Sequence, residues 1–405
     1  MRILIATAGS RGDVAPYTGL GTALRRAGHE VALAATGSFA PLAAAAGLEF
    51  RPLPADPRAH GSVRNSRELL RAASAFVTDL GEGFADAVLQ GGGTDLMLLS
   101  ATTAPLGRHV TEATGVPGLG VYLQPTHPTG DFPPTVTGTR SLGRIGNRTA
   151  GHLAQHMTDR VFTPAAKRLR ERLELPPLPA AHMRRHRRRH DWPVLHGFST
   201  ALLPRPRDWP PHLRVTGSWW PHVDAEHRLP ARLDDFLAAG PPPVLIGFGS
   251  MAAGEGERLS GIAVRALRRA GLRGVLQSGS AGLAAEGDDV LTIGDVPHAL
   301  LFPRLAAVAH HAGAGTAAAA LRAGIPSVTV PVAADQPFWA KRLAAIGAAP
   351  APIPFSGLTA ERLAAALAAA TSDPSYARAA GAAARHMAVE DGAAAVVTAV
   401  RRLPA

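Results

Sequence analysis

Short apolar runs alternate with amphipathic segments along this chain, and this alternation is the feature that most restricts its fold. The run RILIATA at 2–8 precedes a segment in which Leu20, Leu24 and Ala27 recur at helical spacing, until Gly28 ends the pattern. Further apolar runs follow in HEVALAAT, TDLMLLSA and GVPGLGVYL. Apolar strands separated by helices are typical of a doubly wound parallel sheet, so we predict an α/β fold.

The same alternation begins a second time after a proline-rich stretch. Prolines are dense between about 176 and 222, which is typical of a connection between domains. PPPVLIGFGS then starts a new strand, loop and helix, and RGVLQSG, DVLTIGD and PSVTVPV add strands. A chain of 405 residues fits two such domains. Because ligands of open parallel sheets bind beyond the carboxyl ends of the strands, we expect a cleft between them.

Composition and charge exclude several classes of protein. The absence of cysteine excludes disulfides, thiol nucleophiles and Cys-based zinc sites. The formal charge of +11 comes from basic residues that are mostly scattered, and the one dense run, 183–190, has no interleaved aromatic residues. We therefore expect a solvated loop there and no nucleic-acid partner. No apolar run reaches the length of a membrane helix, and MRILIATAG is too short for a signal peptide, so we expect a cytoplasmic protein without an integral membrane segment.

The glycine-rich loop of the second half, GFGSMA at 247–252, loosely matches a dinucleotide-binding fingerprint. That fingerprint needs an acidic residue at the end of the next strand, where this chain has Gln277 and Ser278. A nicotinamide cofactor is therefore not expected. The glycines can still bring Ser250 and nearby amides close to a phosphate.

The segment HHAGAGT at 310–316 predicts a stronger anion site. Gly313 and Gly315 allow a tight turn, and we expect a helix to begin at Thr316 with its free N–H groups and positive dipole end available to an anion. His311 can add a hydrogen bond to the same anion. A plain helix cap explains Gly-Thr equally well, so both interpretations stay open.

The first loop contains a carboxylate with two interpretations. Asp13 lies in GSRGDVAP, between the first strand and the first helix. It can cap the helix, with Pro16 in the first turn, or stand at the cleft as a proton acceptor. No Asp-x-Asp pair and no cluster at metal-ligand spacing is present, so we expect no metal. The Gly-x-Ser-x-Gly turn of many hydrolases is also absent.

Four segments carry a resemblance to a known family. DVPHALLFPRLAAVAHHAGAGTAAAALRAGIPSVTVPVAADQPFWAKRL at 295–343 resembles the nucleotide-sugar signature of family 1 glycosyltransferases of the GT-B fold. The stretches at 9–21, 123–134 and 193–220 also resemble this family, in its bacterial natural-product and sterol-type branch. The resemblance covers nearly the whole chain.

The resemblance implies a role for each candidate residue. Asp13 would be the base that accepts the proton of the acceptor hydroxyl, in a metal-independent single displacement that inverts the anomeric centre. Asp335 and Gln336 would bind the sugar hydroxyls, and Gln277 and Val296 would lie beside the nucleobase. The residues implied for the donor diphosphate are Ser10, Ser250, His311, Gly313, Gly315 and Thr316.

The resemblance also implies domain bounds and substrates. The expected units are an acceptor-binding domain (1–203), a linker (204–222), a nucleotide-sugar domain (223–385) and a final helix (386–405) that packs back on the first domain. We expect no cofactor, UDP-glucose as the first choice of donor and a dTDP-linked 6-deoxyhexose as the second. The acceptor would be a lipophilic molecule with a hydroxyl group, and the protein a monomer or homodimer.

Acceptor contacts are less constrained by the sequence. The apolar face of the segment at about 55–90 can line an acceptor pocket or belong to an ordinary core helix. His127 can face the acceptor or cap its proline-rich loop. Two alternatives of other classes remain, a nucleotide-sugar epimerase of the same fold and a noncatalytic nucleotide-binding relative.

Three departures from the family pattern concern the donor site. The family usually has glycine where Ala312 stands, which matters if the turn needs a positive φ there. It usually has tryptophan where Ser280 stands. Ala333 and Ala334 are small beside the usual residues before the Asp-Gln pair.

Overall fold

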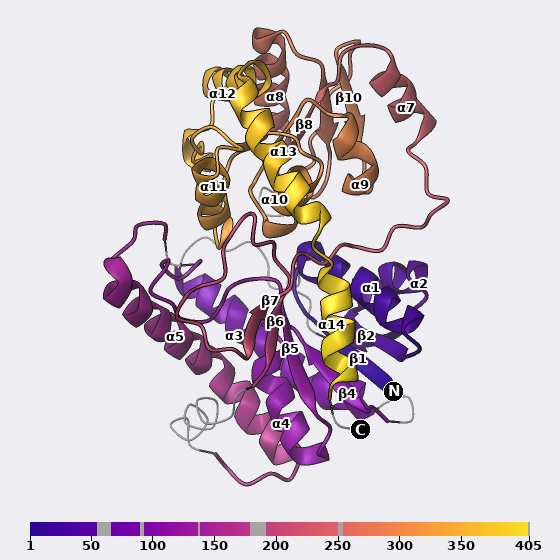
Figure 1. Ribbon diagram of the computed structural model, residues 1–405, viewed down its shortest axis with the longest axis vertical. Coiled ribbons are helices and arrows are strands. Elements are labelled where there is room, and N and C mark those ends of the chain that lie inside the picture. Colours follow the sequence, from indigo (N-terminus) through magenta and orange to yellow (C-terminus); the bar gives the residue numbers. More distant parts are fainter. Residues whose placement is uncertain (55–65, 90–92, 137, 179–191, 250–253, 404–405) are drawn as a thin grey trace.

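The computed structural model describes residues 1–54, 66–89, 93–136, 138–178, 192–249 and 254–403. Within them the chain forms two α/β domains, one above the other in Figure 1. The first contains a parallel seven-stranded sheet in the order β3-β2-β1-β4-β5-β6-β7. Its strands are β1 (Arg2–Ala6), β2 (Glu30–Thr36), β3 (Glu49–Leu53), β4 (Leu96–Leu99), β5 (Gly118–Tyr122), β6 (Val194–His196) and β7 (Leu213–Val215).

Helices cover both faces of the first sheet, which explains why its central strands are apolar throughout. On one face, Ile3 and Ile5 of β1 pack with α1, α2 and α14. On the other, Leu4 and Ala6 pack with α3, α4 and α5. The helices are α1 (Arg11–Arg26), α2 (Ala40–Ala45), α3 (Ser66–Leu89), α4 (Ala104–Thr114), α5 (Gly143–Arg172) and α14 (Gly392–Arg401), with a short 3-10 turn, η1 (Gly37–Phe39).

The second domain contains a parallel five-stranded sheet in the order β10-β9-β8-β11-β12. Its strands are β8 (Val244–Gly247), β9 (Gly274–Gln277), β10 (Val290–Ile293), β11 (Ala307–His310) and β12 (Ser327–Thr329). Helices α8 and α12 cover one face, and α7, α9 and α10 cover the other. The bounds are α7 (Ala231–Ala238), α8 (Gly256–Ala270), α9 (His298–Leu301), η3 (Phe302–Arg304), α10 (Ala314–Arg322), α11 (Gln336–Ala345), η4 (Phe355–Gly357), α12 (Ala360–Ser372) and α13 (Pro374–Ala388).

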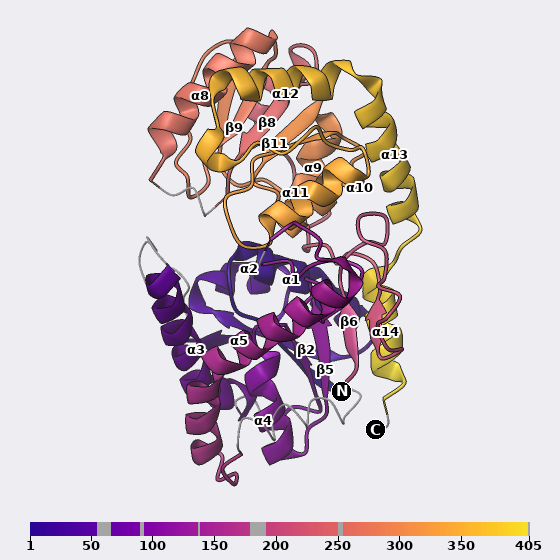
Figure 2. The same cartoon turned by 90° about the vertical axis from the view of Figure 1, so that its left-hand side faces the viewer.

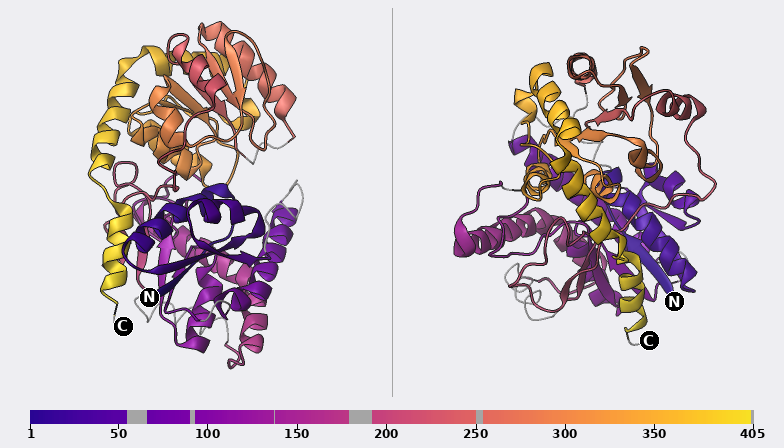
Figure 3. Two further views of the ribbon diagram at one scale, coloured as in Figure 1. Left: turned by 90° about the vertical axis from the view of Figure 1, so that its right-hand side faces the viewer. Right: turned by 45° about the horizontal axis from the view of Figure 1, so that its top comes forward.

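The stretch expected as a linker, 204–222, belongs partly to the first sheet, because β7 pairs with β6 inside it. The end of the chain returns to the first domain. Helix α13 packs on α10, whereas α14 packs on α1 (Figure 3). Trp219 fixes the point where the chain returns to the first domain, because its indole N–H donates to the carbonyl of Gly392 at 3.1 Å.

Apolar packing continues from the first domain into the second. Phe132 and Phe338, from opposite domains, have ring centroids 5.3 Å apart. Gly19 of α1 lies so close to the linker that a Cβ there would be 1.9 Å from the carbonyl oxygen of Trp220. In the described part of the chain, no helix has the length and apolar character needed to cross a membrane.

Candidate functional site

The first loop places Asp13 in the first turn of α1, with Ser10 as the N-cap. The Asp13 carboxylate accepts hydrogen bonds at Oδ2 from the backbone N–H of Ser10 (2.8 Å) and from its hydroxyl (2.9 Å). Its other oxygen, Oδ1, accepts from the side-chain amide of Gln124 at 3.3 Å. Asp13 therefore does help to cap α1, and its other carboxylate oxygen faces the loop that follows β5. Ser10, expected at the donor phosphate, here holds Asp13.

The turn after β11 places an imidazole among glycines. A Cβ at Gly249 would lie 2.7 Å from His311 Cε1, and one at Gly313 would lie 2.5 Å from His311 Nε2. The absence of a side chain at Gly249 and at Gly313 therefore leaves room for the His311 ring. Burial lowers the pKa of His311 to about 4, so the ring is neutral near pH 7. Among the described residues, His311 Nδ1 has no hydrogen-bond partner.

Helix α10 begins two residues earlier than the sequence predicted. Gly313 rather than a side-chain cap precedes it, and Ala317 N–H donates to the carbonyl of Gly313 at 2.9 Å. Thr316, predicted as the first helical residue, is instead the third. The three N–H groups before Ala317 have no carbonyl one turn back, which leaves them for an anion. A Cβ at Gly315 would meet nothing within 4 Å.

The Asp-Gln pair begins α11 after β12. Gln336 is buried, and its amide oxygen accepts from the backbone N–H of Val332 (2.8 Å) and Ala333 (3.3 Å), which holds the preceding loop. Asp335 Oδ2 accepts from the indole N–H of Trp339 at 2.8 Å. Burial raises the pKa of Asp335, and the negative charge of Asp13 raises it further. The carboxylates of the two domains therefore lie close enough to interact.

Gln277, at the end of β9, lies beside the turn that contains Val296. Its amide donates to Asp295 Oδ1 at 3.5 Å. Asp295 also forms an ion pair with Arg11, whose Nη1 lies 3.2 Å from Oδ2. Since Arg11 belongs to α1, this pair bridges the domains next to the predicted nucleobase position. Ser250 lies outside the described residues.

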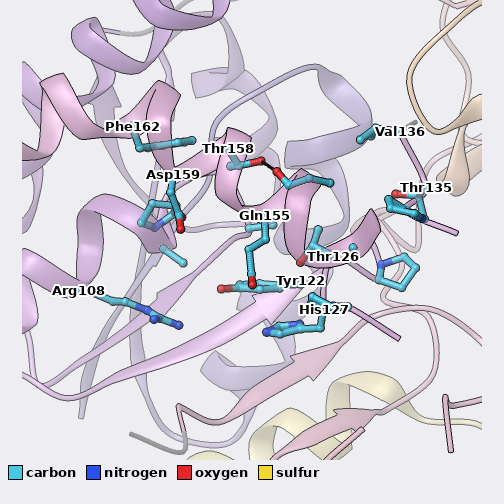
Figure 4. Close-up of a pocket in the computed structure, with 18 of the residues that line it drawn as sticks. Arg108, Tyr122, Thr126, His127, Thr135, Val136, Gln155, Thr158, Asp159 and Phe162 are labelled. Atoms are coloured by element: carbon cyan, nitrogen blue, oxygen red, sulfur yellow. Dashed lines mark hydrogen bonds between the residues drawn. The ribbon is translucent and has the colours of Figure 1, made fainter. Parts of the chain in front are cut away.

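A cavity of about 270 Å³ lies between α4, α5 and the loop after β5 (Figure 4). Its apolar wall includes Phe132 and Phe162. Arg108, Tyr122, Gln155 and Asp159 lie near one another at one end, and Thr135 and Val136 lie at the other end. No described residue of α3 lines the cavity, so its wall differs from the one anticipated at 55–90. Residues 55–65 of that range lie outside the described part.

His127 also lines this cavity. Its ring stacks on Tyr122 with 5.7 Å between centroids and meets the edge of His196 at 5.4 Å. His196 is fully buried and stacks on Trp209, and its Nδ1 donates to the backbone carbonyl of Arg214 at 3.1 Å. Because a carbonyl accepts, Nδ1 carries the proton. Burial lowers the pKa of His196 to about 3.

Two contacts connect the cavity with the residues described above. Gln124, which bonds Asp13, directly precedes the lining segment 125–129. Phe132, in the cavity wall, packs on Phe338 two residues after Gln336. The cavity thus lies next to both Asp13 and the start of α11. Among the described residues, no group of three or more His, Asp or Glu side chains gathers to hold a metal ion.

Sequence reasoning missed the cavity and the Arg11–Asp295 pair. Arg108 and Gln155 are 47 positions apart in sequence, and only the packing of α4 on α5 brings them together. The Ser10–Asp13 contact did have a signal, because a hydroxyl residue followed three positions later by an acid is the spacing of a capping box.

Two family models match the chain. Residues 3–130 match the glycosyltransferase family 28 N-terminal domain. Residues 276–403 match the erythromycin biosynthesis protein CIII-like C-terminal domain. These ranges contain Asp13 and the turn at His311 respectively.

Curated relatives and solved structures agree with these matches. An O-mycaminosyltylonolide 6-deoxyallosyltransferase of Streptomyces fradiae is 38% identical, over 93% of this chain and 91% of that protein. A sterol 3-beta-glucosyltransferase of Arabidopsis thaliana is 32% identical over 90% of this chain and 59% of that protein. The glycosyltransferase of kitacinnamycin has a TM-score of 0.74 at 20% identity, covering 100% of this chain and 99% of its own. A spinosyn rhamnosyltransferase has a TM-score of 0.68 at 21% identity, covering 99% and 100%. These two structures show the same fold.

Proposed function

This chain belongs to the family 1 glycosyltransferases of the GT-B fold, and from that premise we propose that it moves a hexose from a nucleoside-diphosphate sugar to a hydroxyl of a small natural product. The observation that carries this proposal is that the segments next to Asp13 and Asp335 meet across the domains, where Phe132 packs on Phe338, and that the charge of Asp13 acts on Asp335. A base candidate and a sugar-binding candidate thus come from opposite domains to one place. The nucleotide would occupy the second domain and the acceptor the first.

The turn at His311 supports the diphosphate assignment. The N-terminus of α10 offers free N–H groups and the positive end of a helix dipole. His311 is neutral near pH 7, so it would act as a hydrogen-bond donor rather than as a cation. These groups would stabilise the leaving diphosphate without a metal ion.

Asp335 and Gln336 support the sugar assignment. Trp339 donates to Asp335 Oδ2 and so fixes the carboxylate that would bind a sugar hydroxyl. The sequence placed UDP-glucose first and a dTDP-linked 6-deoxyhexose second. The relative with 38% identity, which matches most of both chains, is named a 6-deoxyallosyltransferase, and this favours the second donor.

The cavity between α4 and α5 supports an amphiphilic acceptor. Phe132 and Phe162 give the lining apolar surface, whereas Arg108, Tyr122 and Gln155 give it polar groups. Such a lining fits a lipophilic molecule that carries oxygen substituents far from the reacting hydroxyl. Asp13 would stand at the entrance, beside that hydroxyl.

The reaction is then a single displacement. The acceptor oxygen forms a bond to the anomeric carbon as the bond from that carbon to the diphosphate oxygen breaks. The hydroxyl proton passes to the Asp13 carboxylate, and the electron pair of the broken bond leaves with the nucleoside diphosphate. Attack opposite the leaving group inverts the anomeric centre. Gln124 and Ser10 hold the Asp13 carboxylate in one orientation.

Replacement of Asp13 by asparagine tests this account. We expect Asp13→Asn to lower kcat by about 10²- to 10⁴-fold, because general-base catalysis contributes that much, while the Kd for the donor stays unchanged. Product would be measured by mass spectrometry with dTDP- and UDP-hexoses and a panel of macrolide aglycones and sterols.

Asp224→Asn is the matched control, since Asp224 is exposed just after the linker and its carboxylate, like that of Asp13, accepts a hydrogen bond from a nearby backbone N–H, that of Glu226. It should keep the wild-type rate. An Asp13→Asn enzyme with an unchanged rate would refute the base assignment. A product that retains the anomeric configuration of the donor, seen by NMR, would refute the single displacement.

A further inference from the structure

Four aromatic rings meet where the two domains touch, two from each domain. Phe338 and Trp339 are neighbours on α11 of the second domain, and their ring centroids are 5.1 Å apart. Phe132, from the chain between β5 and α5, lies 5.3 Å from Phe338. Phe198, which follows β6, lies 6.3 Å from Trp339. These separations are typical of favourable aromatic pairs, and we call the four residues the interdomain aromatic cluster.

The interdomain aromatic cluster belongs to a core that crosses the boundary between the domains. Trp339 is fully buried, and Phe198 and Phe338 are each 4% exposed. They share one apolar cluster with Leu99 of β4 and Leu321 of α10. Figure 2 shows α11 on the side of the second domain that faces the first. In such a close-packed interior, the position of each ring depends on its neighbours.

The loop that carries Phe198 is fixed at both ends. The N–H of Gly197, just before Phe198, donates to the last carbonyl of β5 at 2.8 Å. Further along the loop, the carbonyl of Leu202 accepts from Nε of Arg342 on α11 at 3.1 Å. Arg342 follows Trp339 by three positions, so both side chains lie on one side of the helix. The first domain therefore holds this side of α11 through a single fixed loop.

Trp339 connects the interdomain aromatic cluster with the proposed sugar site. Its indole N–H donates to Asp335 Oδ2 at 2.8 Å, one turn earlier on α11. A hydrogen bond weakens steeply when its angle is lost, so a tilt of the indole ring would release the carboxylate. We propose that Phe198 is a positioning residue of the first domain, which packs on Trp339 and thereby holds Asp335 in place for the donor sugar.

The proposal rests on the proposed function, because it takes Asp335 to bind the sugar. Since Phe198 is buried, it would act through Trp339 rather than by touching the donor. Two different outcomes follow for two kinds of ligand. A free nucleoside diphosphate makes no contact with Asp335 and should bind equally well without the Phe198 ring, whereas a nucleotide sugar should bind less well.

Calorimetric titration of the full-length chain with UDP, dTDP, UDP-glucose and dTDP-glucose tests the proposal. The measured quantity is the ratio of the Kd of the glucose conjugate to the Kd of its free diphosphate. Phe198→Leu should raise this ratio about three- to tenfold, because it loosens Trp339. Trp339→Phe, which keeps a ring but removes the N–H, should raise it about tenfold. The double variant should match Trp339→Phe, since both changes act through one hydrogen bond.

Trp220→Leu is the matched control. Trp220 is another aromatic residue at the domain boundary, but it packs on Arg322 in the last turn of α10, with 4.3 Å between guanidinium and ring centre. Its loss should leave the ratio unchanged, even where it lowers the melting temperature as much as Phe198→Leu does.

Three results would overturn the proposal and leave the proposed function intact. These are an unchanged ratio in Phe198→Leu, an equal rise in Trp220→Leu, and a double variant in which the two single effects add in full. A wild-type protein that binds neither the diphosphates nor their conjugates would overturn the proposed function as well.

Discussion

His311 owes its position to the glycines around it. Gly249 and Gly313 leave no side chain where the imidazole lies, and the chain turns between His311 and Gly313 at Ala312, which has φ of 62°. Ala334, just before Asp335, has φ of 57°. Of the three non-glycine residues with positive φ in the described chain, two therefore adjoin the proposed diphosphate and sugar sites. Such conformations cost about 1–3 kcal/mol, and strain of this kind collects at functional sites.

Two glycine substitutions two residues apart should behave oppositely. Gly313→Ala should lower the free energy of unfolding by about 1–3 kcal/mol, because its Cβ would collide with His311 Nε2. Gly315→Ala should keep or raise stability by up to about 1 kcal/mol, because its Cβ enters open space on a helix.

Urea denaturation measures the stability of both variants, and calorimetric titration measures their affinity for dTDP. Gly315→Ala should weaken dTDP binding about tenfold despite its stability, since its methyl group would occupy the space beside the free N–H groups of α10. Unchanged dTDP affinity in a stable Gly315→Ala protein would contradict the placement of the diphosphate.

At the scale of elements, the buried strands were predictable from sequence and the short ones were not. RILIATA, HEVALAAT and PSVTVPV are apolar because helices cover both faces of their sheets. Strand β3, EFRPL, carries Arg51 and a proline, and β6 and β7 are three residues each inside a proline-rich stretch. Their membership in the sheet comes from pairing with distant strands, which periodicity does not encode.

The predictions of where α10 begins and of which segment lines the cavity were wrong for a similar reason. Thr316 looked like a helix start because threonine caps helices, but Gly313 supplies the N-cap through its backbone. The cavity needs α4 and α5, and their facing residues are fixed only by tertiary packing. The motifs at Asp13, His311 and Asp335 are local, so the sequence placed them after β1, β11 and β12, although Asp13 lies inside the first turn of α1 rather than before the helix.

Histidines at the ends of two strands should make stability depend on pH. Burial lowers the pKa of His196, at the end of β6, and of His310, at the end of β11, to about 3 each. The unfolded chain, with histidine pKa near 6.5, therefore takes up protons first as the pH falls. Stability should be full above pH 6.5 and should decline toward pH 3, by roughly 2 kcal/mol per histidine at pH 5.

Urea denaturation between pH 7 and 5 measures this decline, in a range above most carboxylate titration. His196→Phe keeps a ring against Trp209 and removes one titrating group, so its stability should fall less steeply with acid. Equal slopes for wild type and His196→Phe would contradict the assignment.

At the scale of the whole molecule, the two domains meet through a few specific contacts. Besides Arg11–Asp295, the side chains of Lys341 and Arg342 on α11 donate to the carbonyls of Thr139 (2.9 Å) and Leu202 (3.1 Å) in the first domain. The guanidinium of Arg322 on α10 lies 4.3 Å from the ring centre of Trp220. These contacts join the domain that carries Asp13 to the domain that carries Asp335. The net charge of +11 gives the molecule a field that attracts a doubly charged diphosphate.

The central claim is that the cleft binds a nucleoside-diphosphate sugar, and thermal unfolding with UDP, dTDP, GDP and NAD tests it most directly. A ligand at about a hundred times its Kd adds roughly 2.7 kcal/mol to the stability of the folded state, enough to raise the melting temperature by several degrees. We predict such a rise with dTDP or UDP and none with NAD. A rise with NAD, or no rise with any of the four nucleotides, would contradict the account.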